Sequence, residues 1–87
     1  MARYSVRIKT SAIKELEAVA SKKERQRLAR RISALGGEPR PRACQKLAAE
    51  GERYRLRQGR YRVVHSVNDA QQVVVVVKVG HRKEVYR

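Results

Sequence analysis

Residues 53–79 decide the fold, and they read RYRLRQGRYRVVHSVNDAQQVVVVVKV. Over 53–57 apolar side chains alternate with arginines, which is the period-2 pattern of a strand with one buried face. The alternation resumes over 61–67, and His65, on the apolar side of that run, is expected to be a core histidine. The polar break between the two runs, Gln58-Gly59-Arg60, predicts a hairpin turn. The stretch therefore begins with two antiparallel strands.

A second turn and a valine-rich strand complete this half of the chain. Asn68-Asp69-Ala70 consists largely of turn-forming residues. The run 73–79 is almost wholly β-branched and hardly alternates. We expect this third strand to be central in its sheet and covered on both faces, because strands buried on both faces carry continuous apolar runs. Gly80 ends it.

The first half of the chain predicts one strand followed by two helices. Residues 3–9 alternate polar and apolar side chains, as a half-buried strand does. Thr10 and Ser11 are cap-type residues, and apolar side chains recur after them at helical spacing as far as Ala20. A second helix is expected to begin after Ser21, because Ser21-Lys22-Lys23-Glu24 matches a capping box.

The second helix also has signals for its packing and its end. Leu28, Ile32 and Leu35 form an apolar stripe at i, i+4 and i+7. We expect Gly36-Gly37 to supply a left-handed stop, after which Pro39 prevents the helix from continuing. The two helices are therefore expected to form a helical hairpin.

Together these elements predict an α+β fold in a single domain, residues 1–87. The expected order is β-α-α-β-β-β, with the helical hairpin packed on one face of a mainly antiparallel, four-stranded sheet. A chain of 87 residues has one small core and no room for a separate cofactor domain.

The chain is strongly basic. It holds 22 Lys and Arg against 8 Asp and Glu, a net charge of +14 with both histidines neutral. Such a charge favours a polyanionic partner, either nucleic acid or an acidic protein. There is no Trp or Phe, and four tyrosines are too few for the stacking platforms of single-strand binders. The basic run of the second helix, from Lys22 to Arg31, is expected to be a solvated face that helps to steer a polyanion.

Composition excludes several classes of function. The single cysteine, Cys44, permits no internal disulfide, and with only two histidines it makes no ordinary metal site. We therefore expect neither a metal nor a cofactor. The longest apolar run, 73–77, is too short to cross a bilayer, and residues 1–9 lack the apolar stretch of a signal peptide. These observations predict a cytoplasmic protein with no membrane partner.

Four arginines are expected to form a basic groove. Alternate side chains of a strand share a face, so Arg53, Arg55 and Arg57 project together, away from the apolar residues. Arg62 on the next strand joins them. Taken singly, each is the kind of arginine that keeps a sheet soluble. Four like charges on adjacent strands repel one another, however, and this favours a bound phosphate chain.

The residues available for chemistry are cations, a tyrosine and a histidine, because no metal, Ser-His-Asp or phosphate-loop motif is present. Metal-free cleavage of RNA by its own 2′-hydroxyl needs only in-line geometry, charge stabilisation, a base and an acid. Arginines stay protonated, whereas a tyrosine acts as a base only where nearby cations lower its pKa. Tyr86, near Arg82 and Arg87, is such a tyrosine; packing on the sheet is the alternative role.

Two segments make the sequence resemble a known family: residues 54–64, YRLRQGRYRVV, and 79–86, VGHRKEVY. Two shorter motifs, Ile13-Lys14-Glu15-Leu16 and Pro39-Arg40-Pro41, fit the same family. The sequence is similar over its whole length to the RelE branch of the RelE/ParE toxin superfamily. The resemblance implies the toxin of a type II toxin–antitoxin system. Such toxins are metal-independent, ribosome-dependent endoribonucleases that cleave messenger RNA in the A site and inhibit translation.

The resemblance also implies roles for individual residues. Arg62 matches the family arginine that holds the scissile phosphate. Arg82 matches the arginine that stabilises the transition state and protonates the leaving group. Tyr86 matches the tyrosine that activates the 2′-hydroxyl. Arg55 and Arg57 stand where a well-known member has lysines; arginine does not lose its proton, so we expect both to bind RNA and stabilise charge. The other residues expected to bind RNA are Arg53, His81 and Lys83. The general base stays open between Tyr86 and His81.

Partners and alternatives follow from the same resemblance. A cognate, RelB-like antitoxin is expected to fold on binding and to form a hetero-oligomeric complex, and the ribosome with messenger RNA in its A site supplies contacts to ribosomal RNA. One alternative is a ParE-like poison of DNA gyrase, and another is a non-catalytic module that binds the ribosome or RNA. The combination of Arg82 and Tyr86 favours the RelE-like function, because ParE-like proteins generally lack it.

Overall fold

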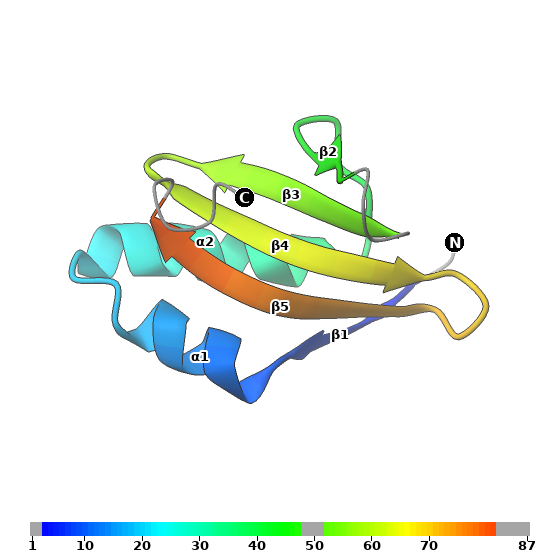
Figure 1. The fold of residues 1–87 in the computed structure, drawn as a ribbon, viewed down its shortest axis with the longest axis horizontal. Helices are drawn as coiled ribbons and strands as arrows, with labels where there is room; N and C mark the ends of the chain where they lie inside the picture. The colour runs from blue at the N-terminus through cyan, green and yellow to red at the C-terminus, as the bar shows by residue number, and fades with distance from the viewer. Residues whose placement is uncertain (1–2, 48–51, 82–87) are drawn as a thin grey trace.

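The computed structural model describes residues 3–47 and 52–81, which form two helices and a five-stranded sheet (Figure 1). The elements in chain order are β1 (Ser5–Ile8), α1 (Thr10–Glu17), α2 (Lys22–Ala34), β2 (Gln45–Lys46), β3 (Arg53–Gln58), β4 (Tyr61–Asn68) and β5 (Val73–His81). The strand order is β1-β5-β4-β3-β2; β1 runs parallel to β5, and every other pair is antiparallel.

The predicted α+β class, with two helices and a mainly antiparallel sheet, is confirmed. The expected four strands correspond to β1, β3, β4 and β5. The additional strand, β2, has two residues and pairs with β3 at the sheet edge. A strand of this length is too short to leave a periodic pattern in the sequence.

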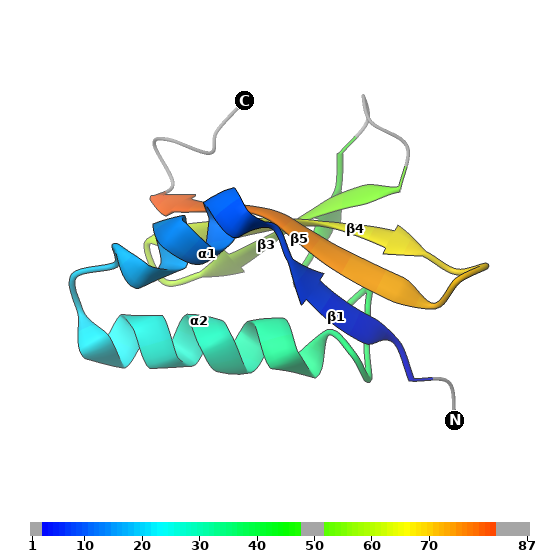
Figure 2. The ribbon, with the colours of Figure 1, turned by 90° about the horizontal axis from the view of Figure 1, so that it is seen from below.

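One face of the sheet is covered by helices. α2 lies beneath the sheet, and α1 lies along β5 beyond the end of β1 (Figures 1 and 2). From α2, Leu28 and Ile32 are almost inaccessible, and Ala12 of α1 is fully buried. The rest of the core comes from one residue between the helices, the residue that follows α2 and the inward side chains of three strands: Val19, Leu35, Tyr54, Leu56, Val63, Val67, Val74, Val76 and Val79.

The valine strand β5 is interior in the sheet, as predicted, and within the described residues its two faces are covered unequally. Val74 and Val76 have no exposed surface, whereas Val73 and Val75 are only half-buried. Within residues 3–47 and 52–81 both helices pack on the inner side, so only alternate valines reach the core. The continuous valine run instead reflects the preference of β-branched residues for strands.

Glu15 of α1 hydrogen-bonds to the part of the β5 edge that lies beyond the end of β1. The pairing of β1 with β5 ends at Ile8, opposite Val76. Beyond that point the Val79 N–H donates to Glu15 Oε1 at 2.9 Å, and Lys78 Nζ donates to Glu15 Oε2 at 2.8 Å. Burial acts to raise the pKa of Glu15, but these two bonds outweigh it and hold the pKa below its usual value.

The predicted N-cap is confirmed for α2 and wrong for α1. Ser21 caps α2, since its side chain accepts a hydrogen bond from the Glu24 N–H at 3.2 Å, as the capping box predicts. The prediction that Thr10 or Ser11 caps α1 is wrong, because α1 begins at Thr10 with Lys9 at the N-cap and no side-chain cap bond. The Lys9 N–H already pairs with the Val76 carbonyl, so β1 leads directly into the helix.

The predicted left-handed stop at Gly36-Gly37 is also wrong. Among the described residues, positive φ angles occur at Gly59, in the β3–β4 turn, and at Gln72. Gly36 is required for close packing instead: a Cβ there would lie 3.0 Å from the Tyr4 carbonyl oxygen. The Tyr4 N–H donates to the Gly36 carbonyl at 2.8 Å, so the end of α2 is held against the start of β1.

Arg40 joins three segments that are distant in sequence. Its guanidinium donates to Glu52 Oε1 at 2.9 Å and to Asp69 Oδ2 at 2.8 Å, and its Nε donates to the Tyr54 hydroxyl at 2.7 Å. Tyr4 donates to the same Asp69 carboxylate and so adds the residue before β1. The hydrogen bonds from Arg40 lower the pKa of both carboxyl groups. The segment after α2 is thereby fixed to β3 and to the β4–β5 turn.

Replacing Arg40 tests how much this network stabilises the fold. We expect Arg40→Gln to lower Tm by about 3–6 °C, because partly exposed ion pairs stabilise modestly even when several act together. The loss should shrink in high salt, which screens the ion pairs. Thermal melts should compare it with Arg42→Gln, which removes an exposed arginine two residues away. Equal effects of the two changes would contradict the network's role.

His65 is fully buried beneath the network, as expected for a core histidine. Its ring is stacked on the Tyr54 ring, with centroids 5.7 Å apart. Its Nε2 lies 2.8 Å from the Pro39 carbonyl oxygen, which can only accept, so Nε2 carries the proton of a neutral imidazole. Burial lowers the pKa of His65; the Pro39 hydrogen bond acts in the opposite direction, and the charge of Arg40 adds to the lowering.

The buried imidazole predicts a pH dependence of stability. Above about pH 6.5 the histidine is neutral in both states; below it the unfolded chain binds a proton that the folded chain excludes, so stability falls towards the folded pKa. We expect the free energy of unfolding, measured by urea titration, to decrease between pH 6.5 and 5. His65→Gln keeps a donor for Pro39 but does not titrate, so it should flatten this decrease. An unchanged slope in the variant would contradict the assignment.

Candidate functional site

The register of β3 and β4 gathers arginines on the outer face of the sheet. Tyr54 and Leu56 of β3 are buried, so the arginines that alternate with them face away from the helices. Arg57 lies directly opposite Arg62, and Arg55 lies two cross-strand pairs further along, opposite Val64. The predicted grouping of these arginines on one face is confirmed.

Three of the arginines line one hollow, here called the arginine pocket. Its volume is about 370 Å³, and its described lining residues are Ala43, Gln45, Arg55, Arg57 and Arg62. Gln45 stands opposite Arg55 in the β2–β3 pair, and its Oε1 accepts a hydrogen bond from an Arg55 guanidinium nitrogen at 2.9 Å. The uncharged amide therefore orients Arg55 without neutralising it.

The electrostatics of the arginine pocket favour an anion. Like charges directly opposite each other in a sheet are destabilising, and Arg57 and Arg62 are such a pair. Among the described residues no carboxylate lines the pocket. Guanidinium groups match a phosphate in a bidentate geometry and remain charged at any physiological pH, so the pocket can bind phosphate and stabilise added negative charge. The same property makes these arginines unsuitable as general bases.

Gln45 and Ala43 are pocket residues that sequence reasoning missed. They belong to the segment that joins α2 to β3, for which no strand was expected. The segment carries no periodic signal, and it takes its position from the contacts of Arg40 with β3 and the β4–β5 turn. Only the tertiary structure could have identified these two residues.

The other predicted site residues are placed differently. Arg53 shares the outer face with the pocket but pairs with Ser66, two positions from Arg55, and is not among the described residues that line it. His81 pairs with Tyr61 and lines a separate hollow. Arg82, Lys83 and Tyr86 lie outside the described residues.

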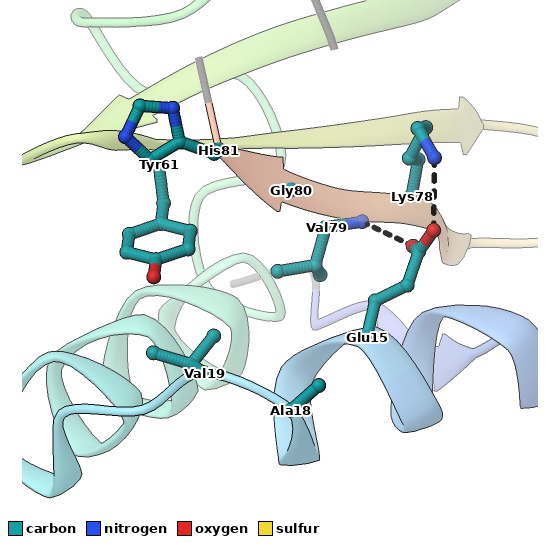
Figure 3. A pocket seen from close by; sticks show the side chains of 8 residues that line it. All are labelled: Glu15, Ala18, Val19, Tyr61, Lys78, Val79, Gly80 and His81. Atoms are coloured by element: carbon teal, nitrogen blue, oxygen red, sulfur yellow. Dashed lines mark hydrogen bonds and ion pairs between the residues drawn. The ribbon is translucent and has the colours of Figure 1, made fainter. Parts of the chain in front are cut away.

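The second hollow lies between α1 and the paired ends of β4 and β5 (Figure 3). Its volume is about 590 Å³, and its described lining residues are Glu15, Ala18, Val19, Tyr61, Lys78, Val79, Gly80 and His81. The Tyr61 and His81 rings meet edge to face, with centroids 5.7 Å apart. The carboxylate of Glu15 is already bound by Lys78 and Val79, so this mixed surface is suited to contact rather than to chemistry.

Within residues 3–47 and 52–81, no three His, Cys, Asp or Glu side chains are grouped as metal ligands. Over the same residues, no helix has the length and apolar character needed to span a membrane.

Comparisons with known proteins agree with this architecture. Residues 6–86 match the family described as the ParE toxin of the type II toxin–antitoxin system parDE. A search of curated proteins gave no match. Solved structures similar to this chain include the archaeal RelE–RelB complex from Pyrococcus horikoshii, with a TM-score of 0.81, 33% identity, and coverage of 94% of this chain and 97% of that one.

Two further structures come from bacteria. The RelBE2 toxin–antitoxin complex from Mycobacterium tuberculosis has a TM-score of 0.79 at 27% identity, covering 92% of this chain and 99% of that one. The isolated E. coli RelE toxin has a TM-score of 0.77 at 30% identity, and the match covers 95% of this chain and 90% of that one. The family match and these likenesses show that the chain belongs to the ParE toxin family, within the RelE/ParE superfamily of type II toxins, and is of the RelE-like branch.

Proposed function

We propose that this toxin is a metal-independent endoribonuclease that cleaves messenger RNA in the ribosomal A site by attack of a 2′-hydroxyl on the adjacent phosphate. The observation that carries the proposal is the arginine pocket, in which Arg55, Arg57 and Arg62 converge on the face of the sheet away from α1 and α2. Neither α1 nor α2 covers that face, so neither of these helices has to move for a phosphate to reach it.

In the proposed reaction the 2′-oxygen bonds to phosphorus while the bond from phosphorus to the 5′-oxygen breaks. The products are a 2′,3′-cyclic phosphate and a 5′-hydroxyl. Arg57 and Arg62 flank the phosphate from adjacent strands, and Arg55, oriented by Gln45, adds a third positive charge. Charge that grows on the phosphoryl oxygens is stabilised by groups already in place, which is the largest contribution available to such a site.

Two protons must also move. A base removes the proton of the 2′-hydroxyl, and an acid gives one to the departing 5′-oxygen. Following the family resemblance, we assign the first step to Tyr86 and place Arg82 at the departing 5′-oxygen. Because a guanidinium keeps its own proton, Arg82 stabilises the charge on this oxygen and a water molecule supplies the proton. The alternative base, His81, lines the hollow beside Tyr61 rather than the described wall of the arginine pocket, which supports the choice of Tyr86.

We further propose that a cognate antitoxin neutralises the toxin and forms a hetero-oligomeric complex with it. RelE toxins similar to this chain are found in complexes with RelB antitoxins, including the one from Pyrococcus horikoshii. A net charge of +14 suits an acidic partner, which could fold over the basic surface as it binds. The site of action is the cytoplasm, where translating ribosomes are.

A second function, poisoning of DNA gyrase, is favoured by one observation: the matching family model is named for the ParE toxin. That function needs no phosphate-cleaving residues. The two proposals therefore differ in what substitution of the pocket arginines should do.

The test is a cleavage assay with programmed ribosomes and end-labelled messenger RNA. We expect cuts confined to the A-site codon and dependent on ribosomes. Arg62→Ala and Arg82→Ala should each slow cleavage by about 10²–10³-fold, the usual effect of removing one charge-stabilising donor, and Tyr86→Phe should also abolish rapid cleavage. Arg60→Ala is the matched control, because Arg60 is exposed in the neighbouring turn and should leave cleavage near wild type.

Other outcomes of the assay contradict the proposal. Intact messenger RNA together with loss of gyrase supercoiling activity would assign the ParE-like function. Ribosome binding without cleavage, with a growth phenotype unaffected by Tyr86→Phe, would identify a non-catalytic module. Equal loss of cleavage in Arg60→Ala and Arg62→Ala would show that overall charge, and not the arginine pocket, is what matters.

A further inference from the structure

The three arginines of the arginine pocket fall into a pair and a single residue. Arg57 and Arg62 lie directly opposite each other on β3 and β4. Arg55 lies two residues away along β3 on the same face, about 7 Å from Arg57 at the usual rise of a strand. Its cross-strand neighbours, Gln45 on β2 and Val64 on β4, are both uncharged. The positive charge of the pocket is therefore divided between two places.

Gln45 holds Arg55 on the side of β3 away from Arg62. The strands β2 and β4 flank β3 on opposite sides (Figure 1). Gln45 Oε1 accepts a hydrogen bond from Arg55 Nη2 at 2.9 Å, which directs this nitrogen towards β2, whereas Arg62 projects from β4. The guanidinium of Arg55 is thus separated from the pair both along β3 and across the sheet.

The charges of the pocket match two phosphates better than one. Each phosphodiester of RNA carries one negative charge, and the charge on the scissile phosphate grows as the 2′-oxygen attacks. The pair formed by Arg57 and Arg62 balances this growing charge. The positive charge of Arg55 then exceeds what one phosphate needs, and no carboxylate is among the described lining residues. One nucleotide of an extended RNA strand spans a distance similar to that between Arg57 and Arg55, so the next phosphate falls at Arg55.

The hydrogen bond between Gln45 and Arg55 is better explained by ligand binding than by stability. Both partners lie at the surface, where one hydrogen bond adds little to the free energy of unfolding. The carbonyl oxygen of Gln45 accepts from Arg55, and its amide nitrogen has two N–H donors. Such amide donors are common partners of phosphate oxygens. A carboxylate at this position would also accept from Arg55 but would neutralise its charge.

We propose that Gln45 is a positioning residue that holds Arg55 for the phosphate next to the scissile one, so that the arginine pocket binds two consecutive phosphates of the RNA. The inference rests on the proposed function for the choice of RNA as the ligand. It adds a requirement for the substrate: a strand of three nucleotides, with two charged phosphates, fills the pocket, whereas a single phosphate leaves Arg55 without its ligand.

The test is an NMR titration of the full chain with a 2′-O-methyl RNA trinucleotide, which has two phosphates and cannot react. Two analogues each have one phosphate replaced by an uncharged methylphosphonate. The variants are Arg55→Gln and Gln45→Leu. The matched controls, Arg60→Gln and Gln71→Leu, change exposed residues in the β3–β4 and β4–β5 turns. Circular dichroism confirms that all four variants are folded.

We expect the wild type to bind the two-phosphate RNA about tenfold more tightly than either analogue, the usual effect of one charged hydrogen-bonding contact. Arg55→Gln should bind all three RNAs with similar affinity. Gln45→Leu should lose most of the preference, because Arg55 is no longer held in place, although its charge is kept. Both controls should keep the full preference.

Three results would overturn the inference or separate it from the proposed function. Equal affinity of the wild type for all three RNAs would show that one phosphate fills the pocket. An unchanged preference in Gln45→Leu would remove the positioning role of Gln45. If ribosomal cleavage depends on Arg62 while the preference is absent, the inference alone fails. If the preference depends on Arg55 and Gln45 while no messenger RNA is cut, the nuclease function fails and the inference stands.

Discussion

Within residues 3–47 and 52–81, helices cover only one face of the sheet, and the arrangement of these residues depends on that constraint. Inward side chains of the strands meet α1 and α2 and form the core. The outer side chains of the same strands are free to carry charge. Because strand residues alternate between faces, a single run such as residues 53–57 supplies both the core and the arginine pocket. The core side chains and the pocket arginines thus come from the same few residues without competing for positions.

The segment between α2 and β3 links the polar network to the pocket. Arg40 fixes this segment to β3 and to the β4–β5 turn, and His65 holds its start through the Pro39 carbonyl. A few residues later, Gln45 reaches Arg55 from the neighbouring strand. One wall of the arginine pocket is therefore positioned by contacts of Arg40 and His65, and neither residue is among those that line the pocket.

How much of this could be predicted depends on the range of the interactions. The hairpin at Gly59, the cap at Ser21 and the shared face of Arg55 and Arg57 follow from local rules, and the structure has all three. The role of Gly36 could not be read from its neighbours, because it is set by the approach of Tyr4, the residue before β1. Gln45 was missed for the same reason.

The outward-facing valines of β5 show a further limit of prediction from sequence. The valine run of this strand predicted coverage on both faces, yet only the tertiary arrangement decides how many faces the helices reach. Likewise, the sequence grouped His81 with the RNA-binding residues, whereas the register of β4 and β5 puts it beside Tyr61 in the second hollow. Composition reveals the excess of positive charge; the fold determines which of these charges line the arginine pocket.

The central claim, that the arginine pocket receives the scissile phosphate, is tested most directly by NMR of the arginine side chains. The protein would be titrated with a short RNA that carries a 2′-deoxy nucleotide at the cleavage position, which binds but cannot react. The account predicts shifts of the Nε–Hε signals of Arg55, Arg57 and Arg62, with Arg40 unchanged because its donors are already bound to Glu52, Tyr54 and Asp69. Shifts confined to Tyr61 and His81, with the pocket arginines unmoved, would contradict it.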